Sequence, residues 1–118
     1  MEQKTKESRR DDDLPLTKGL SPAPNPNGET RLWIGNLNNK KVTAEAISGM
    51  FSGVKFVQLV SDPKGRPKGF AFAEMRSAED AGRAVGAGGK VWMGRGVKVN
   101  YQKWDGKSAW PPPDAVHF

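Results

Sequence analysis

Three aromatic residues stand in stretches whose alternation is typical of β-strands. Trp33 alternates with two aliphatic residues, and Phe70 and Phe72 alternate with glycine and alanine. Because successive side chains of a strand point to opposite faces of its sheet, the rings face away from the side that takes the aliphatic and small residues. We therefore expect a patch of exposed rings, which normally marks a binding site and offers stacking as its chemistry. The opposite assignment would bury the rings, but a face of glycine and alanine suits close packing of helices.

Composition excludes most other chemistry. The sequence has no cysteine, which excludes disulfides, thiolate metal sites and thiol catalysis. Its single histidine, His117, follows the expected domain, which excludes a Ser/His/Asp arrangement or a multi-histidine metal site inside that domain. The acidic residues Glu45, Glu79 and Asp80 are dispersed along expected helices, where caps and solvated charges explain them. We expect neither an enzyme nor a bound metal or small cofactor.

The net charge indicates a class of partner. Among 118 residues, 19 are Lys or Arg and 13 are Asp or Glu, which gives a formal net charge of +6. Residues 31–104 carry 13 bases and 5 acids, whereas residues 1–30 carry 5 bases and 6 acids. A basic domain of this kind favours a polyanionic partner. No apolar run approaches the roughly 20 residues of a membrane helix, and the charged N-terminus lacks the apolar stretch of a secretory signal, so we expect an intracellular protein without membrane contact.

The rings need a sheet that positions them, and the order of the elements provides one. Alternating or β-branched stretches predict strands at 31–35, 54–60, 68–75 and 97–100. Helical spacing of apolar residues predicts one helix at 43–51 and another that begins after Ser77, with Thr43 and Ser77 as N-caps. The order β-α-β-β-α-β is the split-βαβ arrangement of a ferredoxin-like α+β fold. We expect a four-stranded antiparallel sheet with two helices on one face and the other face open.

The segments that flank this domain differ from it in composition. Residues 1–30 are charged and contain GLSPAPNPNGE, so we expect a disordered, solubilising arm. Residues 31–104 form the predicted domain, and residues 105–118 form a proline-rich tail in which Trp110 precedes three prolines. Consecutive prolines favour an extended polyproline conformation. The aromatic residues of the tail could pack on the parent domain or dock on another protein, and the sequence favours neither.

Two of the predicted strands resemble the motifs of a known family. Residues 68–75, KGFAFAEM, resemble the octamer ribonucleoprotein motif of the RNA recognition motif family, K/R-G-F/Y-G/A-F-V-x-F/Y. Residues 32–37, LWIGNL, resemble its partner hexamer, and the stretch SAEDAGRAV is also similar to the family. The resemblance covers about residues 31–101. It departs from the motif at Ala73 and Met75, which lie on the expected helix side and concern core packing rather than binding.

The resemblance implies roles for the residues of the two motifs. Trp33 would stack on one base and Phe72 on the next, with Phe70 between the two riboses. Lys68 would pair with a phosphate, and Asn36 of the hexamer is assigned to the same RNA-binding surface. The expectation of stacking on these rings does not depend on the resemblance, because every base has a π-face. Stacking on a ring therefore tolerates any base and contributes about 1–3 kcal/mol per base.

Further candidate contacts border this surface. Lys98 and Asn100 fall on the same face of the fourth strand, and Phe56 and Gln58 share that face on the second strand. Arg66 belongs to a loop beside the sheet, where several bases would collect phosphates. The chain directly after the fourth strand, where the family often continues its binding surface, adds Tyr101, Lys103 and Trp104. The two aromatic residues of this last group could equally cover an exposed end of the core.

Two other kinds of function compete with RNA binding. Some members of the family grip a peptide tryptophan with their helical side, using acidic residues of the first helix and an Arg-x-Phe loop. This sequence has only Glu45 in that helix and no phenylalanine in Met93-Gly94-Arg95-Gly96, which disfavours a protein-binding module. A small ferredoxin-like enzyme would need a pocket of carboxylates, which the dispersed acids do not predict.

We therefore expect a single RNA recognition motif that binds single-stranded RNA in an extended conformation. Single-stranded DNA stays open as a ligand, because stacking does not read the 2′-hydroxyl group. A protein partner bound through the proline-rich tail is a second expectation, and so is scaffold membership in a ribonucleoprotein. No small-molecule substrate is expected, and the sequence does not separate nucleus from cytoplasm.

Overall fold

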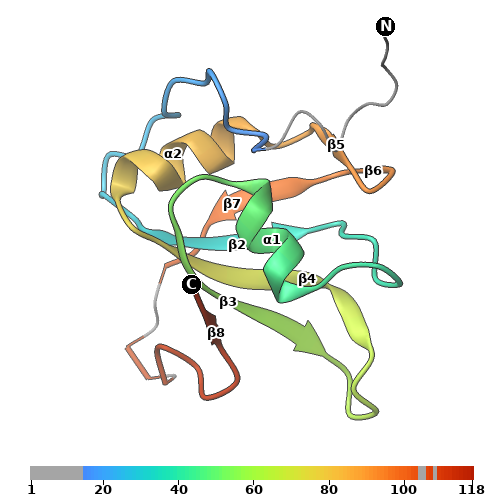
Figure 1. The fold of residues 1–118 in the computed structure, drawn as a ribbon. Helices are drawn as coiled ribbons and strands as arrows, with labels where there is room; N and C mark the ends of the chain where they lie inside the picture. The colour runs from blue at the N-terminus through green and yellow to red at the C-terminus, as the bar shows by residue number, and fades with distance from the viewer. Residues whose placement is uncertain (1–14, 104–105, 108) are drawn as a thin grey trace, which may run out of the picture.

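A five-stranded antiparallel sheet forms the centre of the computed structural model, which describes residues 15–103, 106–107 and 109–118. The strands follow the order β7-β2-β4-β3-β8 (Figure 1). They are β2 (Arg31–Gly35), β3 (Val54–Ser61), β4 (Pro67–Met75), β7 (Lys98–Tyr101) and β8 (Val116–His117). Figure 1 shows the helices α1 (Ala44–Met50) and α2 (Ala78–Gly86) on one face of the sheet. The predicted βαββαβ order and the ferredoxin-like α+β class are confirmed.

Both helices begin after the N-caps that the sequence predicts. The hydroxyl of Thr43 accepts a hydrogen bond from the backbone N–H of Ala46 at 3.0 Å. The hydroxyl of Ser77 accepts one from the backbone N–H of Asp80, also at 3.0 Å. Each bond satisfies a donor that the first turn of a helix leaves without an intrahelical partner. The caps therefore fix where each helix starts, and the apolar side of each helix then packs on the sheet.

The core lies between the helices and the sheet, and it follows the alternation of the strands. Leu32 and Ile34 of β2 are 0 % exposed, as are Ala71 and Ala73 of β4, and Met75 is 1 % exposed. Burying a leucine or isoleucine side chain contributes about 1.5–3 kcal/mol relative to leaving it exposed. The predicted assignment of faces is confirmed, since the aliphatic and small residues point to the helices.

Two short elements go beyond the predicted four strands. Strand β8 pairs with the outer edge of β3 and makes it an inner strand. A hairpin of β5 (Val91–Trp92) and β6 (Arg95–Gly96) precedes β7. Its turn contains Met93 and Gly94 at φ values of 51° and 82°, the left-handed backbone that two-residue hairpins require. A strand of two residues is too short to show alternation, so the sequence did not reveal these elements.

The segment 15–30 packs on the helices, so the expectation of a disordered arm over residues 1–30 is wrong for this part. Leu16 is buried in the core, and Ala23 donates a backbone hydrogen bond to the backbone oxygen of Gly82 in α2 at 3.0 Å. In Figure 1 this segment, drawn in blue, runs alongside α2. Its few apolar residues gain burial on a surface that the rest of the chain builds, which composition alone does not indicate. The remainder of the predicted arm lies outside the described residues.

Candidate nucleic-acid interface

The three predicted rings form one continuous patch on the face of the sheet opposite the helices. Trp33 lies opposite Phe72 in the register of β2 and β4, and Phe70 lies two residues before Phe72 on the same face. The ring centroids are 6.3 Å apart between Trp33 and Phe70 and 6.1 Å apart between Phe70 and Phe72. All three residues are half-buried, so each ring keeps surface in contact with solvent. The patch offers ring faces on which flat groups stack.

The position of Trp33 depends on Gly35, two residues further along the same strand. A Cβ atom on Gly35 would lie 2.1 Å from Cη2 of Trp33, so the indole fills the space that a side chain would take. Gly35 is itself buried. The absence of a side chain at Gly35 therefore lets the indole lie along the strand, beside Phe70.

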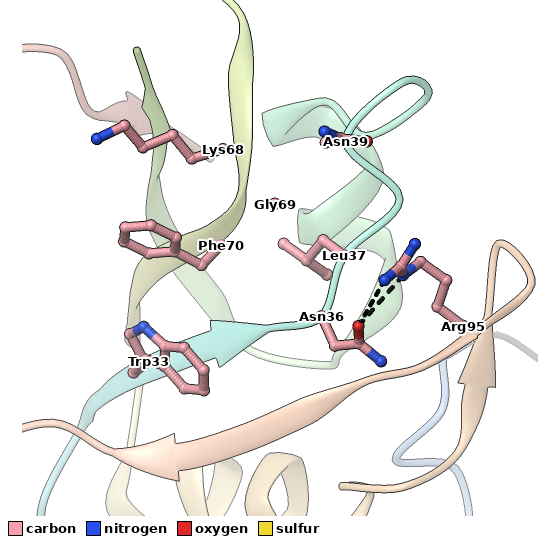
Figure 2. A pocket seen from close by; sticks show the side chains of 8 residues that line it. All are labelled: Trp33, Asn36, Leu37, Asn39, Lys68, Gly69, Phe70 and Arg95. Carbon is pink, nitrogen blue, oxygen red and sulfur yellow. Dashed lines mark hydrogen bonds between the residues drawn. The ribbon is translucent and has the colours of Figure 1, made fainter.

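The patch continues into a hollow of about 300 Å³ where β2 ends and β4 begins (Figure 2). Trp33 and Phe70 line one side of it, and Lys68 and Arg95 bring positive charge to its rim. Figure 2 shows Lys68 and Phe70 projecting from β4 on the same side as Trp33. Rings and cations together suit a nucleotide, since rings stack on bases and cations pair with phosphates.

Asn36 organises the rim of this hollow. Its φ of 58° is a left-handed conformation that asparagine adopts more readily than most residues. Its Nδ2 donates to the backbone oxygen of Gly96 at 2.8 Å, and its Oδ1 accepts from Nη2 and Nε of Arg95 at 2.8 and 3.2 Å. Figure 2 shows the bonds between Asn36, which directly follows β2, and Arg95 of the hairpin strand β6. Asn36 is thus placed at the predicted surface, with its amide engaged in holding Arg95.

Arg95 is a candidate contact that the sequence did not single out. It is exposed and lines the hollow, and the planar guanidinium group suits a phosphate. Its partner Asn36 lies 59 positions away in the chain. The bond that holds Arg95 beside the hollow is therefore a contact of the folded molecule between distant residues, and alternation within one strand does not predict it.

Two further predicted contacts are exposed beside the patch, and a third is exposed after β7. Asn100 lies opposite Trp33 in the register of β2 and β7, and Lys98 lies opposite Gly35, so both share the face of the rings. Lys103 follows β7 and is exposed as well. Amide and ammonium groups at the border of a stacking patch add hydrogen bonds to base edges and ion pairs to phosphates.

Arg66 lies in the loop between β3 and β4 and is engaged by Asp62. Its Nε donates to Oδ2 of Asp62 at 2.9 Å, and its backbone N–H donates to Oδ1 at 2.9 Å. Chiefly this backbone bond, with the Arg66 side chain and the N–H of Lys64, lowers the pKa of Asp62 below its ordinary value. Asp62 is therefore ionised at neutral pH, and it offsets part of the charge that Arg66 offers to a phosphate.

The prediction that Tyr101 extends the stacking row is wrong. Tyr101 lies opposite Leu32 in the register of β2 and β7, so it points to the helix-covered face and packs on the core. Its hydroxyl donates to the backbone oxygens of Pro24 and Ala23 at 2.9 and 3.3 Å, and burial raises the pKa of Tyr101. Tyr101 thus fastens the N-terminal segment to the sheet. Trp104 lies outside the described residues, and its stacking role stays a prediction.

Phe56 and Gln58 lie on the predicted face, but the C-terminal segment covers them. Phe56 is 3 % exposed, and its ring centroid lies 5.1 Å from that of Trp110. Nε2 of Gln58 donates to Oδ1 of Asp114 at 3.0 Å. Their contact with a ligand therefore stays a prediction that requires the tail to move.

Ionisable side chains do not gather into a metal site in the described part of the chain. No group of three or more His, Cys, Asp or Glu residues there could hold an ion. Nor does any described helix have the length and apolarity that crossing a membrane needs.

Comparison with known proteins agrees with this geometry. The family model described as the RNA recognition motif matches residues 32–98. The chain is 46 % identical over 77 residues to "Putative RNA-binding protein RbpF" of Nostoc sp., which covers 61 % of this chain and 72 % of that protein. Among solved structures, the Rna15 RRM with bound RNA (GU) is 28 % identical with a TM-score of 0.54, covering 63 % of this chain and 83 % of that one. The RNA-binding protein PG1 is 29 % identical with a TM-score of 0.57, covering 62 % of this chain and 93 % of that one. The chain belongs to the RNA recognition motif family.

Proposed function

We propose that the chain binds single-stranded RNA by stacking bases on the open face of its sheet. The observation that carries this proposal is the continuous patch of three half-exposed rings, Trp33, Phe70 and Phe72, bordered by exposed bases. Membership of the family supports RNA as the ligand. The relatives named as RNA-binding proteins, and the related structure whose name includes bound RNA, support it further.

Stacking holds the bases of the RNA, and ion pairing holds its phosphates. Trp33 and Phe72 lie opposite each other on neighbouring strands, so two successive bases each find a ring while Phe70 packs between their sugars. Lys68 and Arg95 at the hollow pair with phosphates. A sheet of this type stacks two or three bases. After the cost of ordering the RNA, we expect a dissociation constant near micromolar, about −8 kcal/mol.

Phe72→Ala and, separately, Trp33→Ala test this proposal. Each removes a ring from solvent rather than from the core, so we expect unchanged thermal unfolding and RNA binding weakened by about 1–3 kcal/mol. Fluorescence anisotropy with labelled random-sequence RNA measures the affinity. Val91→Ala removes a side chain that is 44 % exposed on the hairpin, outside the patch, and should change neither quantity.

Two results would contradict the proposal. If both ring variants fold and bind RNA normally, the sheet is not the RNA surface. If either variant unfolds, its ring belongs to the core. A selection from a random RNA pool would then identify the preferred bases, and single-stranded DNA of the same sequence would show whether the 2′-hydroxyl is read.

We further propose that the chain acts as a binding protein, without a catalytic step, inside the cell. The patch offers stacking and charge, which serve binding, and the described residues hold no group of three or more His, Cys, Asp or Glu that could bind a metal ion. A protein partner bound through the C-terminal tail is the second proposal. It is supported by Val116 and Phe118, which expose 37 % and 40 % of their surface. Such a partner would bind the outer side of the tail or take the tail from the sheet.

A further inference from the structure

The C-terminal segment lies against the same face of the sheet as the aromatic patch. The ring centroid of Trp110 lies 5.1 Å from that of Phe56, and its Nε1 donates to Oε1 of Glu74 at 2.8 Å. The guanidinium group of Arg31 lies over the Trp110 ring, 5.1 Å from its centroid. The indole is therefore held by a ring, a carboxylate and a cation that all belong to the sheet.

The covered positions continue the row of rings by one strand. In the register of β3 and β4, Gln58 lies opposite Phe72 and Phe56 lies opposite Glu74. Phe56 is thus a fourth ring on the face that carries the patch, and it points away from the helices. The rings of Trp110 and His117, at 5.1 and 5.2 Å, both belong to the tail and cover it. Without the tail, Phe56 would present its ring to solvent.

Trp110 shares two features with a nucleobase. It has a flat π-face, which packs on Phe56, and an N–H donor, which reaches Glu74. Every base has a π-face, and each of the four RNA bases carries at least one N–H donor on its edge. We propose that Phe56 and Glu74 form a further nucleobase position, which Trp110 occupies until a sufficiently long RNA displaces the tail. This inference rests on the proposed RNA binding at the open patch.

The tail is held by contacts that a ligand can replace. Strand β8 has two residues, both exposed, and the backbone N–H of Phe118 donates to the backbone oxygen of Lys55 at 2.9 Å. Arg76 donates to the backbone oxygen of Phe118 at 2.9 Å. Short segments with exposed hydrogen bonds open locally without unfolding the rest of a protein. The tail is part of the same chain, so it competes with RNA at a high effective concentration.

Competition of this kind depends on RNA length. A trinucleotide can be bound on the open patch alone, so the tail does not affect it. An octanucleotide can reach Phe56 as well, and its apparent affinity is reduced by the fraction of molecules in which the tail covers that ring. Trp110→Ala removes the competing ring and leaves the open patch unchanged.

The full chain, its Trp110→Ala variant and a Pro113→Ala control test the proposal with random-sequence RNA of three and eight nucleotides. Pro113 is an exposed residue of the same tail. We expect Trp110→Ala to bind the octanucleotide about threefold to tenfold more tightly, with no change for the trinucleotide and none for Pro113→Ala. Amide hydrogen exchange of Phe118 in the unaltered chain needs no substitution. Its protection should fall in the complex with the octanucleotide and persist in the complex with the trinucleotide.

Equal or weaker binding of the octanucleotide by Trp110→Ala would overturn the proposal, since weaker binding would mean that Trp110 itself contacts RNA. Full protection of the Phe118 amide in the saturated octanucleotide complex would also overturn it. If the unaltered chain binds neither RNA, the proposed RNA binding itself is wrong. This result differs from those that contradict only the displacement of the tail, in which the unaltered chain does bind RNA.

Discussion

Trp33 takes its position from a neighbour that has no side chain. Because a Cβ atom on Gly35 would lie 2.1 Å from the Trp33 indole, Gly35→Ala must turn that ring away. The ring is half-buried and can move into solvent, so we expect the fold to persist. RNA binding should weaken by up to the effect of losing one stacked base, about 1–3 kcal/mol. Fluorescence anisotropy measures the affinity, and the NMR signal of the Trp33 Nε1–H reports the movement.

The control for this variant is Gly49→Ala. A Cβ atom at Gly49 would meet nothing within 4 Å, and the residue lies in α1 on the opposite side of the sheet. It should leave RNA affinity unchanged. If Gly35→Ala bound RNA normally with an unshifted Trp33 signal, the indole would not depend on the glycine.

Tyr101 is expected to support stability and not binding. Tyr101→Phe removes a hydroxyl that donates to the backbone oxygen of Pro24 at 2.9 Å. A hydrogen bond of this kind contributes about 0.5–1.5 kcal/mol, so urea unfolding should show a loss of that size at neutral pH. RNA affinity should not change, because Tyr101 lies on the helix-covered face. A loss of RNA affinity with unchanged stability would mean that Tyr101 contacts RNA after all.

The contribution of Tyr101 also has a defined pH dependence. Burial raises the pKa of the phenol above its ordinary value of 10.0, so the folded state favours the protonated form. The stability it contributes is present below pH 10 and is lost as pH rises through the raised folded value. The difference in unfolding free energy between the wild type and Tyr101→Phe should therefore shrink in strong alkali. A constant difference would show that the hydroxyl does not titrate with the fold.

Among the elements, helix α2 has a glycine, Gly82, at the point where the N-terminal segment 15–30 packs against it. A Cβ atom on Gly82 would lie 2.9 Å from the backbone oxygen of Ala23 and 2.9 Å from Cβ of Pro22, so Gly82→Ala must push the segment away. Alanine favours a helix over glycine by about 1 kcal/mol, yet we expect Gly82→Ala to lower the free energy of unfolding. Hydrogen exchange at the Ala23 amide should accelerate, because its bond to Gly82 is lost.

Gly49→Ala provides the matched comparison in α1. With open space around its Cβ atom, it should gain the helix propensity and raise the free energy of unfolding by about 0.5–1 kcal/mol. Urea unfolding of both variants measures the contrast. If Gly82→Ala stabilised the protein as much as Gly49→Ala, with Ala23 still protected, the segment would not pack on α2.

The elements that could be predicted are those long enough to show a period. Strands β2 and β4 alternate over five and nine residues, and both helices carry an N-cap followed by apolar residues at helical spacing. Strands β5, β6 and β8 have two residues each, too few for any period. The sequence of segment 15–30 shows no periodic pattern. Its conformation is set by contacts with helices α1 and α2, which are distant in the sequence.

For the molecule as a whole, the residues of the candidate site also fall into those that the sequence predicted and those that it did not. Alternation within single strands was enough to place Trp33, Phe70 and Phe72 on one open face. The bond of Arg95 to Asn36 and that of Trp110 to Glu74 join residues 59 and 36 positions apart. Such contacts depend on the folded surface that both partners meet. The sequence therefore predicted the chemistry of the patch, but neither its arginine nor the tail that covers its far end.

The positive charge of the whole domain predicts how binding depends on salt. Residues 31–104 carry 13 bases and 5 acids. Four exposed bases are candidates for contacts with phosphates: Lys68 and Arg95 line the hollow, Lys98 shares the face of the rings, and Lys103 follows β7. For a single strand, the log–log slope of affinity against salt is about −0.7 per phosphate neutralised, so three or four contacts give a slope of about −2 to −3. Anisotropy titrations over a series of KCl concentrations measure it.

Lys68→Gln isolates one of these contacts at the hollow. It should weaken RNA binding at low salt and reduce the magnitude of the slope by about 0.7, because one fewer counterion is released. Lys18→Gln removes an exposed charge from the N-terminal segment and should leave the slope unchanged, since that segment packs on the helix side of the sheet. The two substitutions alter net charge equally, so a general effect of charge would lower both slopes alike. A slope near zero for the unaltered chain would show that stacking alone holds the RNA.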